Sequence, residues 1–281
     1  MEIKFNEVHY MYNEKKDIAK PALSNINLEF KEKTINGVIG KSGSGKTTMV
    51  ELINALMLPT KGNIKVGSRI LSKTRKIKNI NNLRYKIGLV FQFPEEQFFC
   101  QTVKKEIEFG MKYFNKSVTD IKKHVSDALL MVGLNDSYLE RNPHTLSSGE
   151  KRKVAIASIL AFNPKIIILD EPTIGLDNQS KDNLIKIIKL LKNRYKKMII
   201  IVSNDTNLLH KIVDNIVILN EGNIVLSGNK YEVFKENIEQ YGIKKPQIID
   251  FIQLVKKEKN IKLLHRDDIN DLMKDVFRNV K

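Results

Sequence analysis

The residues of this chain with the clearest chemical meaning form the glycine-rich stretch GKSGSGKT at positions 40–47. It matches the pattern G-x-x-x-x-G-K-[ST], follows an apolar segment typical of a strand, and precedes a predicted helix that begins near Thr47. Glycines let backbone N–H groups face a phosphate chain, and the helix N-terminus adds favourable partial charge. Lys46 would reach the β and γ phosphates of a nucleotide, and Thr47 would bind Mg²⁺. The alternative is a chance glycine turn. The candidate phosphate-binding residues are Gly40, Lys41, Ser42, Gly43, Ser44, Gly45, Lys46, Thr47 and Thr48.

A second candidate element is the acidic end of the apolar run IIILDE, at positions 166–171. Phosphoryl transfer needs a carboxylate that acts through Mg²⁺ and a group that orients the attacking water. Asp170 is predicted to take the first role, and Glu171 is predicted to polarise the water. Two surface acids after a strand are common on their own, but beside a phosphate loop they predict nucleotide hydrolysis.

The elements that must position these residues follow from the apolar pattern. EIKFNEVHYMY and INLEF predict antiparallel strands at the start of the chain, joined by a turn within residues 13–21. Buried-strand runs then occur at 86–92, 165–170, 198–203 and 215–220, separated by helical stretches such as the one with Leu184, Ile187, Ile188 and Leu191. This alternation predicts an α/β fold with a largely parallel sheet covered by helices.

The end of the chain has a different pattern, because strand signals stop after Gly228. Two short amphipathic helices are predicted there after a break at Pro246, one around residues 248–255 and one around 269–276. We therefore predict a main domain at residues 1–228 and a helical C-terminal extension at residues 229–281.

Composition limits the class of protein. The chain has 281 residues, 42% of them hydrophobic, and a single cysteine, which excludes an internal disulfide framework. The N-terminus lacks the pattern of a signal peptide, and no segment approaches the roughly 18 apolar residues that cross a bilayer. The formal net charge of +16 would suit nucleic acid or an anionic membrane, but the lysines are scattered, which favours a solvated surface.

Further motifs carry a family resemblance. LSSGEKRKVAIASIL, at positions 146–160, resembles the signature motif of ATP-binding cassette (ABC) proteins, and EPTIGLD, which ends at Asp177, resembles their D-loop. Gln92 matches the Q-loop glutamine, and Tyr12 stands where an aromatic residue stacks on adenine. The resemblance covers about residues 2–228 and implies a P-loop ATPase fold with an N-terminal antiparallel β subdomain and a helical subdomain.

The same resemblance implies a mechanism. Two cassettes would pack head to tail around two ATP molecules, with Mg²⁺ held at Thr47, Gln92 and Asp170, and the signature of each chain acting on the partner's ATP. The spacing of Ser147 and Glu150 independently predicts a helix-capping box. The family usually has Gly in place of Ser148 and Gln in place of Glu150, so this signature is slightly degenerate. The signature residues are Leu146, Ser147, Ser148, Gly149 and Glu150.

The stretch FQFPEEQFF, at positions 91–99, resembles the ATPases of energy-coupling factor importers of vitamins and metals. That resemblance implies that Glu95 and Glu96 pair with arginines of a transmembrane subunit while aromatic side chains add apolar contact. A buried aromatic turn with two solvated glutamates is the alternative. The implied contact residues are Phe93, Pro94, Glu95, Glu96, Gln97, Phe98 and Phe99.

The resemblance also implies partners and a location. The FPEEQ version of this stretch favours pairing with a related second ATPase over a homodimer. A transmembrane coupling subunit and a separate membrane subunit that selects the substrate would complete an importer on the cytoplasmic side of the cell membrane, without nucleic acid. The alternatives are a soluble ABC ATPase of nucleic acids or ribosomes, or a weakly hydrolytic regulatory partner.

The stretch VSNDTN, at positions 202–207, departs from the family pattern. Family versions read much like V-T-H-D, so Asn204 stands at the position of the switch histidine. Asparagine can donate a hydrogen bond to the γ-phosphate, but it carries no positive charge. We therefore predict slow hydrolysis at the site built on this chain's phosphate loop; the alternative is that Asn204 is an adequate substitute because Glu171 dominates.

Overall fold

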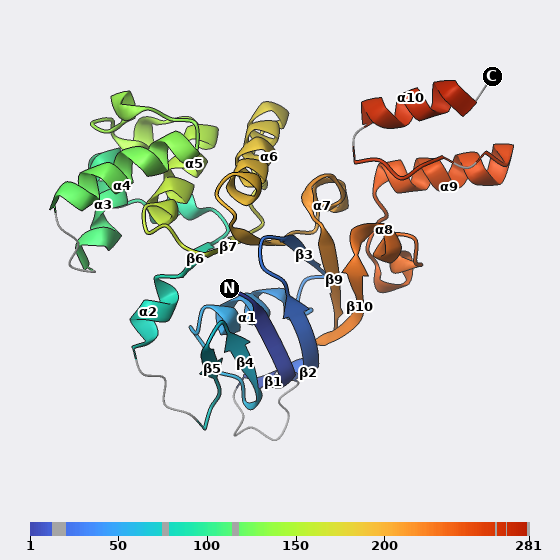
Figure 1. Ribbon diagram of the computed structural model, residues 1–281, viewed down its shortest axis with the longest axis horizontal. Coiled ribbons are helices and arrows are strands. Elements are labelled where there is room, and N and C mark those ends of the chain that lie inside the picture. The colour runs from blue at the N-terminus through green and yellow to red at the C-terminus, as the bar shows by residue number, and fades with distance from the viewer. Residues whose placement is uncertain (13–20, 75–78, 114–117, 262, 268, 280–281) are drawn as a thin grey trace.

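The computed structural model describes residues 1–12, 21–74, 79–113, 118–261, 263–267 and 269–279. The predicted turn between the first two strands lies outside the described residues, apart from Pro21. Two sheets and a set of helices make up the described chain (Figure 1).

The smaller sheet is antiparallel and has the strand order β2-β1-β4-β5. The first two strands, β1 (Ile3–Met11) and β2 (Pro21–Phe30), confirm the prediction from alternating residues. The sequence pattern did not reveal β4 (Lys61–Val66) or β5 (Arg69–Leu71). The buried side chains of β1 and β2 pack toward the larger sheet, so this layer covers one of its faces.

The larger sheet has the strand order β10-β9-β3-β8-β7-β6. Its strands are β3 (Ile35–Ile39), β6 (Ile87–Val90), β7 (Ile166–Asp170), β8 (Met198–Val202), β9 (Asn215–Asn220) and β10 (Asn223–Asn229). All adjacent pairs are parallel except β9 and β10, which form an antiparallel edge. The predicted, largely parallel sheet is confirmed.

Both faces of this sheet are covered from β6 to β9, which explains why these strands are mostly apolar, whereas the edge strand β10 is partly exposed. On β7, Ile167 and Leu169 join the core beneath the helices, while Ile166 and Ile168 join the core shared with the smaller sheet and α1 (Lys46–Ile53). Successive side chains of a strand point to opposite faces, so a run of adjacent isoleucines fills both cores at once.

The remaining helices cover the second face of the sheet and extend past its two ends. They are α2 (Ile80–Arg84), α3 (Val103–Tyr113), α4 (Val118–Met131), α5 (Ser148–Leu160), α6 (Asn178–Asn193), α7 (Thr206–Ile212), α8 (Lys230–Val233), α9 (Gln247–Lys259) and α10 (Ile269–Asn279). Figure 1 shows α3, α4 and α5 beyond the β6 edge, and α9 and α10 beyond the β9–β10 edge. The predicted apolar stripe of α6 is buried.

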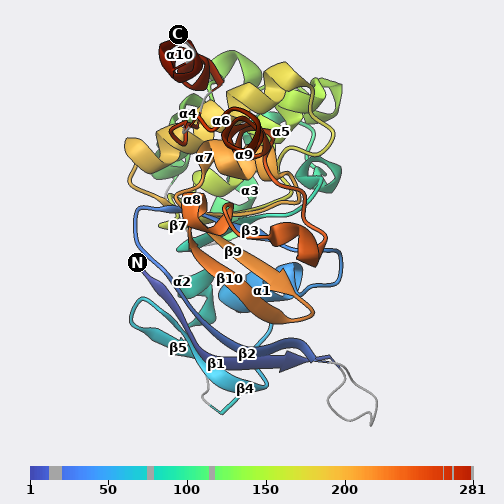
Figure 2. The ribbon, with the colours of Figure 1, turned by 90° about the vertical axis from the view of Figure 1, so that its right-hand side faces the viewer.

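The two helices predicted in the C-terminal extension are present as α9 and α10, preceded by the short helix α8. Pro246 directly precedes α9, and Ile252, Leu263 and Leu272 form a small core between α9 and α10. In Figure 2 these helices lie far from the antiparallel sheet. The helices of the described ranges are all too short or too polar to cross a bilayer.

Candidate active site

The phosphate loop connects the end of β3 to the start of α1, as the sequence predicts. Gly43 and Gly45 have φ angles of 78° and 104°, a region that favours glycine. A Cβ atom on Gly45 would lie 2.5 Å from the carbonyl oxygen of Ala22, so the loop also needs glycine for space. Helix α1 begins at Lys46, next to the predicted start near Thr47.

The Lys46 side chain lies inside this loop and is almost completely buried. Its Nζ donates hydrogen bonds to the carbonyl oxygens of Gly40, at 2.6 Å, and Lys41, at 3.0 Å. Burial lowers the pKa of Lys46, although the carboxylates of Glu171 and Asp170 act in the opposite direction. A phosphate group would offer this ammonium a charged acceptor in place of the two carbonyl oxygens.

The order of the strands brings the other predicted residues to the same edge of the sheet. β3, β8 and β7 are parallel neighbours, so the segments that follow their carboxyl ends lie close together. These segments are the phosphate loop, residues 203–205 and the acidic pair. The structure therefore brings Lys46, Asp170, Glu171 and Asn204 into one site.

Glu171 is held rigidly at this edge. Its φ angle of 43° is uncommon for a residue with a side chain, and its carboxylate is buried. The carboxylate accepts hydrogen bonds from Ser203 Oγ, at 3.0 Å, and from the Asn204 backbone N–H, at 2.9 Å. Burial raises the pKa of Glu171 above its ordinary value despite these two hydrogen bonds, and burial also raises the pKa of Asp170. A fixed carboxylate of increased basicity suits a group that polarises water.

The segment after β8 supports Glu171 through its backbone. Asn204 is exposed, while Asp205 accepts a hydrogen bond from the backbone N–H of Leu208 and caps the N-terminus of α7. Ser203 is fully buried, and its Oγ also accepts from the N–H of Asp205. Sequence reasoning missed Ser203; its place directly after the buried strand, one residue before Asn204, was the available signal.

The residues predicted to contact adenine and Mg²⁺ flank this centre. Tyr12 is 47% exposed, and its hydroxyl lies 2.9 Å from Thr48 Oγ1, at the start of α1. Thr47 and Gln92 are exposed, and Asp170 is buried at the end of β7. A hydroxyl, an amide oxygen and a carboxylate are oxygen ligands of the kind that Mg²⁺ prefers, so this donor set fits the predicted ion.

The signature residues lie elsewhere, at the start of α5. The predicted capping box is confirmed: Ser147 is the N-cap, its Oγ accepts from the N–H of Glu150, and Glu150 accepts from the N–H of Ser147 at 2.9 Å. Glu150 also accepts a 2.6 Å hydrogen bond from the hydroxyl of Tyr138. The Tyr138 and Ser147 hydrogen bonds lower the pKa of Glu150 to about 2.

Around the signature, Leu146 is buried and Ser148 is exposed. A Cβ on Gly149 would lie 2.6 Å from Ser180 Oγ, so this position requires a small residue. A cleft of about 220 Å³ runs between α5 and α6 and shares no lining residue with the cleft beside Asn204, within the described ranges. Asp177 caps α6 by accepting a 2.7 Å hydrogen bond from the N–H of Ser180. The signature thus lines a different cleft from the one beside this chain's phosphate loop.

Residues 93–99, which we call the coupling segment, differ from the prediction at one glutamate. Glu95 does not offer its carboxylate to a partner, because Oε1 lies 3.0 Å from Nη2 of Arg152 in the same chain. The side chain of Glu95 is only 17% exposed, and that of Arg152 only 2%. Glu95 is therefore paired with an arginine of its own chain, and its predicted contact with an arginine of a membrane subunit stays a prediction. Arg152 was missed, although its helical spacing of four from buried Ile156 places it on the inner face of α5.

The rest of the coupling segment divides between core and surface. Pro94 and Phe98 are buried, while Glu96, Gln97 and Phe99 are exposed. Phe99 packs edge-on against Phe109 of α3, with ring centroids 4.6 Å apart, yet the two remain 61% and 57% exposed. Phe93 adopts a φ angle of 50°, which starts a short 3₁₀ helix, Pro94–Gln97.

The C-terminal extension reaches the phosphate loop. Lys41 packs against Gly242, and a cleft of about 640 Å³ beside Asn204 is lined both by the phosphate loop and by Lys244 and Lys245. This contact was not predicted, because it joins segments that are about two hundred residues apart in the chain.

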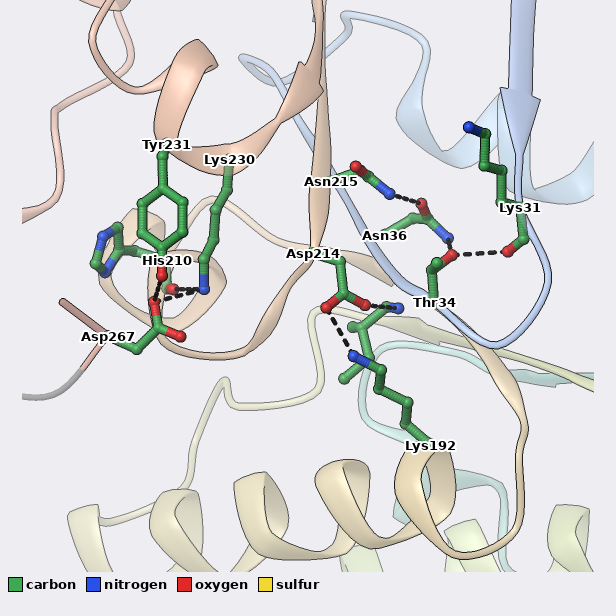
Figure 3. A network of polar contacts seen from close by, with 11 residues as sticks. Lys31, Thr34, Asn36, Lys192, His210, Asp214, Asn215, Lys230, Tyr231 and Asp267 are labelled. Atoms are coloured by element: carbon green, nitrogen blue, oxygen red, sulfur yellow. Dashed lines mark hydrogen bonds and ion pairs between the residues drawn. The ribbon is translucent and has the colours of Figure 1, made fainter. Parts of the chain in front are cut away.

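Polar contacts fix the extension to the helix that follows Asn204. Lys230 donates to the carbonyl oxygen of His210, at 2.8 Å, and pairs with Asp267, at 2.7 Å (Figure 3). Tyr231 donates a 2.6 Å hydrogen bond to the same carboxylate. Burial lowers the pKa of His210 to about 4. On the other side of Figure 3, Asp214 accepts from the N–H of Ile35 and pairs with Lys192.

Comparison with known proteins agrees with this geometry. The profile of the ABC transporter family matches residues 23–174. The chain is 41% identical to the energy-coupling factor transporter ATP-binding protein EcfA2 of Clostridium perfringens, over 90% of this chain and 89% of that protein. It is 37% identical to the EcfA2 protein of Spiroplasma kunkelii, over 99% of this chain and 92% of that one.

Solved structures show the same fold. The cbiO1 protein of Clostridium perfringens, described as part of the ABC transporter complex cbiONQ, matches with a TM-score of 0.76 and 31% identity, covering 89% of this chain and 98% of that chain. The ATP-binding cassette MJ0796, solved as a dimer bound to ADP and Pi, matches with a TM-score of 0.71 and 28% identity, covering 81% of this chain and 98% of that one.

Proposed function

Since this chain belongs to the ABC transporter family and shares most of its length with energy-coupling factor ATP-binding proteins, we propose that it is the ATP-hydrolysing subunit of an energy-coupling factor importer. Closure of a head-to-tail pair of cassettes on ATP would drive uptake of a vitamin or a transition metal through separate membrane proteins. The chain would act at the cytoplasmic face of the cell membrane.

The observation that carries this proposal is the arrangement at one edge of the larger sheet. The buried ammonium of Lys46 lies in a loop shaped for phosphate, and the carboxylate of Glu171 is fixed by Ser203 and the backbone of Asn204. On nucleotide binding, Lys46 would exchange its carbonyl acceptors for phosphate oxygens. Glu171 would keep its two donors and orient the water that attacks the γ-phosphate.

Mg²⁺ is part of the proposal. Thr47, Gln92 and Asp170 would hold the ion together with oxygens of the nucleotide, and the ion would neutralise charge on the phosphates. Among the described residues, no group of three or more His, Cys, Asp or Glu side chains is placed to hold a metal.

The partners are also proposed. The capped helix start at Ser147 would meet the ATP of a second, related ATPase, and the C-terminal extension, residues 229–281, would help to hold the two ATPases together. Exposed apolar side chains on α9 and α10, including Phe251, Met273 and Phe277, support such a contact. The exposed part of the coupling segment would contact the transmembrane subunit, and a separate membrane subunit would select the substrate.

Two substitutions test the proposed function in the assembled complex. Lys46→Ala should weaken ATP binding about tenfold or more, because it removes a charge-assisted contact with phosphate. Glu171→Gln should bind ATP normally and lower kcat by about 10²- to 10⁴-fold, the range of a general base.

Nucleotide affinity and ATP-driven uptake are the measurements. Lys31→Ala, at an exposed lysine of the β2–β3 turn, is the matched control for Lys46→Ala and should change neither. Undiminished turnover in Glu171→Gln would reject the role of Glu171, and a wild-type complex without ATP-driven uptake would reject the importer.

A further inference from the structure

One buried guanidinium joins three segments of the molecule that the proposed mechanism uses separately. Arg152 belongs to α5, the helix that begins with the signature residues. Its Nη2 lies 3.0 Å from Oε1 of Glu95 in the coupling segment and 3.1 Å from the carbonyl oxygen of Ile174. Ile174 belongs to the turn between β7 and α6, residues 171–177, which begins at Glu171 and ends at Asp177.

The same turn is hydrogen-bonded to the backbone of Glu171. The backbone N–H of Ile174 donates a hydrogen bond to the carbonyl oxygen of Glu171, at 3.3 Å, so Ile174 is bonded to Arg152 on one side and to Glu171 on the other. A displacement of Glu95 would therefore move the guanidinium, then Ile174, and then the backbone that sets the strained conformation of Glu171.

A second contact joins the same segments. A Cβ atom on Gly175 would lie 3.8 Å from a ring carbon of Phe93, so the first aromatic residue of the coupling segment lies against the turn. Gly175 has a φ angle of 76°, which glycine tolerates and which a larger residue would strain. The coupling segment thus touches the turn both through Arg152 and directly.

The ion pair between Arg152 and Glu95 leaves some of its donor and acceptor atoms without a hydrogen bond. Nε and Nη1 of Arg152 and Oε2 of Glu95 are buried without a hydrogen-bond partner among the described residues. Arginine and carboxylate often pair through two parallel hydrogen bonds, whereas this pair uses one. Buried donors and acceptors without partners cost free energy, so a small movement of Glu95 that completes the pair would be favourable.

We propose that Arg152 is a positioning residue through which the coupling segment controls the turn that carries Glu171. The inference rests on the proposed function, because that function assigns the coupling segment to contact with a membrane subunit. Arg152 does not touch the reacting atoms. It transmits the position of Glu95 to Ile174, so that docking of the membrane subunit and the geometry of hydrolysis depend on each other.

The test uses conservative variants in the assembled complex. Arg152→Lys keeps the charge but cannot span both acceptors as the planar guanidinium does, and Glu95→Gln keeps an acceptor but loses the charge. Both should assemble and bind ATP as the wild type does. Their kcat should fall about tenfold with KM within about twofold, the effect of losing one charge-assisted hydrogen bond that acts after binding. Asp182→Asn, which neutralises the surface partner of Lys211, is the control and should keep kcat within about twofold.

A second measurement needs no membrane partner. In the isolated chain, hydrogen exchange of the backbone amides of residues 171–177 should be faster in Arg152→Lys than in the wild type, while exchange in β8 should be unchanged. A merely structural role would lower thermal stability and speed exchange throughout α5 instead. If Arg152→Lys fails to fold, Glu95→Gln decides with the same readouts.

Each outcome bears on the inference. A lower kcat together with faster exchange in the turn supports it, and wild-type kcat in both variants overturns it. A lower kcat without a change in the turn also overturns it, because Arg152 would then act by another route. Failure of the wild-type complex to import would reject the proposed function separately, and the exchange result on the isolated chain would still decide the link between Arg152 and the turn.

Discussion

Asn204 contributes to the site through its backbone N–H, so its side chain can be replaced without removing that contact. The backbone N–H holds Glu171, and the exposed side chain faces the cleft beside the phosphate loop. Replacing the side chain should therefore leave Glu171 in place. The position lacks the positive charge that a histidine could offer to the γ-phosphate.

We predict that Asn204→His raises the ATPase rate of the site built on this chain's phosphate loop about tenfold, because a charged donor would stabilise the developing charge on phosphate. The rate should be measured in the complex with the partner ATPase's own site disabled by a glutamate-to-glutamine change at its catalytic position. The same complex with wild-type Asn204 is the reference. An unchanged or lower rate would mean that asparagine serves adequately and that the two sites are not unequal for this reason.

The stabilisation of the fold by the capping box depends on pH, because Glu150 titrates. Its folded pKa, about 2, lies below the ordinary value of 4.5, so the unfolded chain binds the proton more readily. The capping box therefore stabilises the fold fully above pH 4.5, and this stabilisation is lost as the pH falls toward 2. Family members usually have glutamine here, which does not titrate.

We predict that Glu150→Gln lowers the free energy of unfolding at pH 7 and that the difference from the wild type disappears as the pH approaches 2. Urea unfolding across this range, followed by circular dichroism, measures it. Ser147→Ala, which removes the cap itself, should cost about 1 kcal/mol at pH 7. A difference between Glu150→Gln and wild type that stays constant with pH would contradict the assigned ionisation.

Whether a site residue could be predicted depends on how far away in the sequence its contacts lie. The phosphate loop, the acidic pair and the capping box could be predicted, because each depends on residues close together in the sequence. The contact between Glu95 and Arg152 was missed because it joins residues 57 positions apart, and neither residue type indicates its partner. The support of Glu171 by Ser203 depends on the pairing of β7 with β8 and could not be read from either strand alone.

At the level of elements, the strands that could be predicted from the sequence are those buried on both faces. Strands β6 to β9 are covered on both faces, so their continuous apolar runs stand out. β4 contains Lys61, Gly62 and Lys65 and is exposed along one face, and β5 has three residues, so neither produced a strand signal. The helical subdomain followed from the family resemblance, and the pattern did not locate α3 and α4. The division at residue 228 stays a prediction.

The C-terminal extension should depend on one carboxylate. Asp267 satisfies both the buried ammonium of Lys230 and the hydroxyl of Tyr231, and it lies between α9 and α10. We predict that Asp267→Asn lowers the free energy of unfolding by about 1–3 kcal/mol, less than for a fully buried pair because Asp267 is half-exposed. Asp271→Asn, which breaks an exposed pair with Lys274, is the matched control and should leave the free energy of unfolding unchanged.

Urea unfolding gives both values, and limited proteolysis reports where the loss occurs. Cleavage in Asp267→Asn should increase between α9 and α10 and not in the antiparallel sheet. Equal stability of the two variants would show that the contacts of Asp267 with Lys230 and Tyr231 do not anchor the extension.

At the scale of the whole molecule, the active site lies between two surfaces that would meet other proteins. The coupling segment lies beside α3 and α5 at one end of the sheet, and the extension lies at the other end and contacts the phosphate loop through Gly242. Arg152 bonds to Ile174 in the turn that begins at Glu171, and Lys230 bonds to His210 of α7, the helix that follows Asn204. Both ends of the fold are therefore hydrogen-bonded to segments that lie next to the site.

The last prediction concerns the exposed residues of the coupling segment. Because Glu95 is paired inside the chain, the exposed carboxylate of Glu96 and the exposed ring of Phe99 should carry the contact with the membrane subunit. We predict that Glu96→Lys weakens co-purification with that subunit about 10- to 100-fold, since a like charge at a charged interface costs a few kcal/mol. Glu29→Lys makes the same change in net charge on the exposed face of β2 and should assemble normally. ATP binding should be unchanged in both, which separates lost docking from lost folding. Normal assembly of Glu96→Lys would mean that the acids of this segment do not recognise the partner and that Phe99 and Phe109 should be tested as the contact instead.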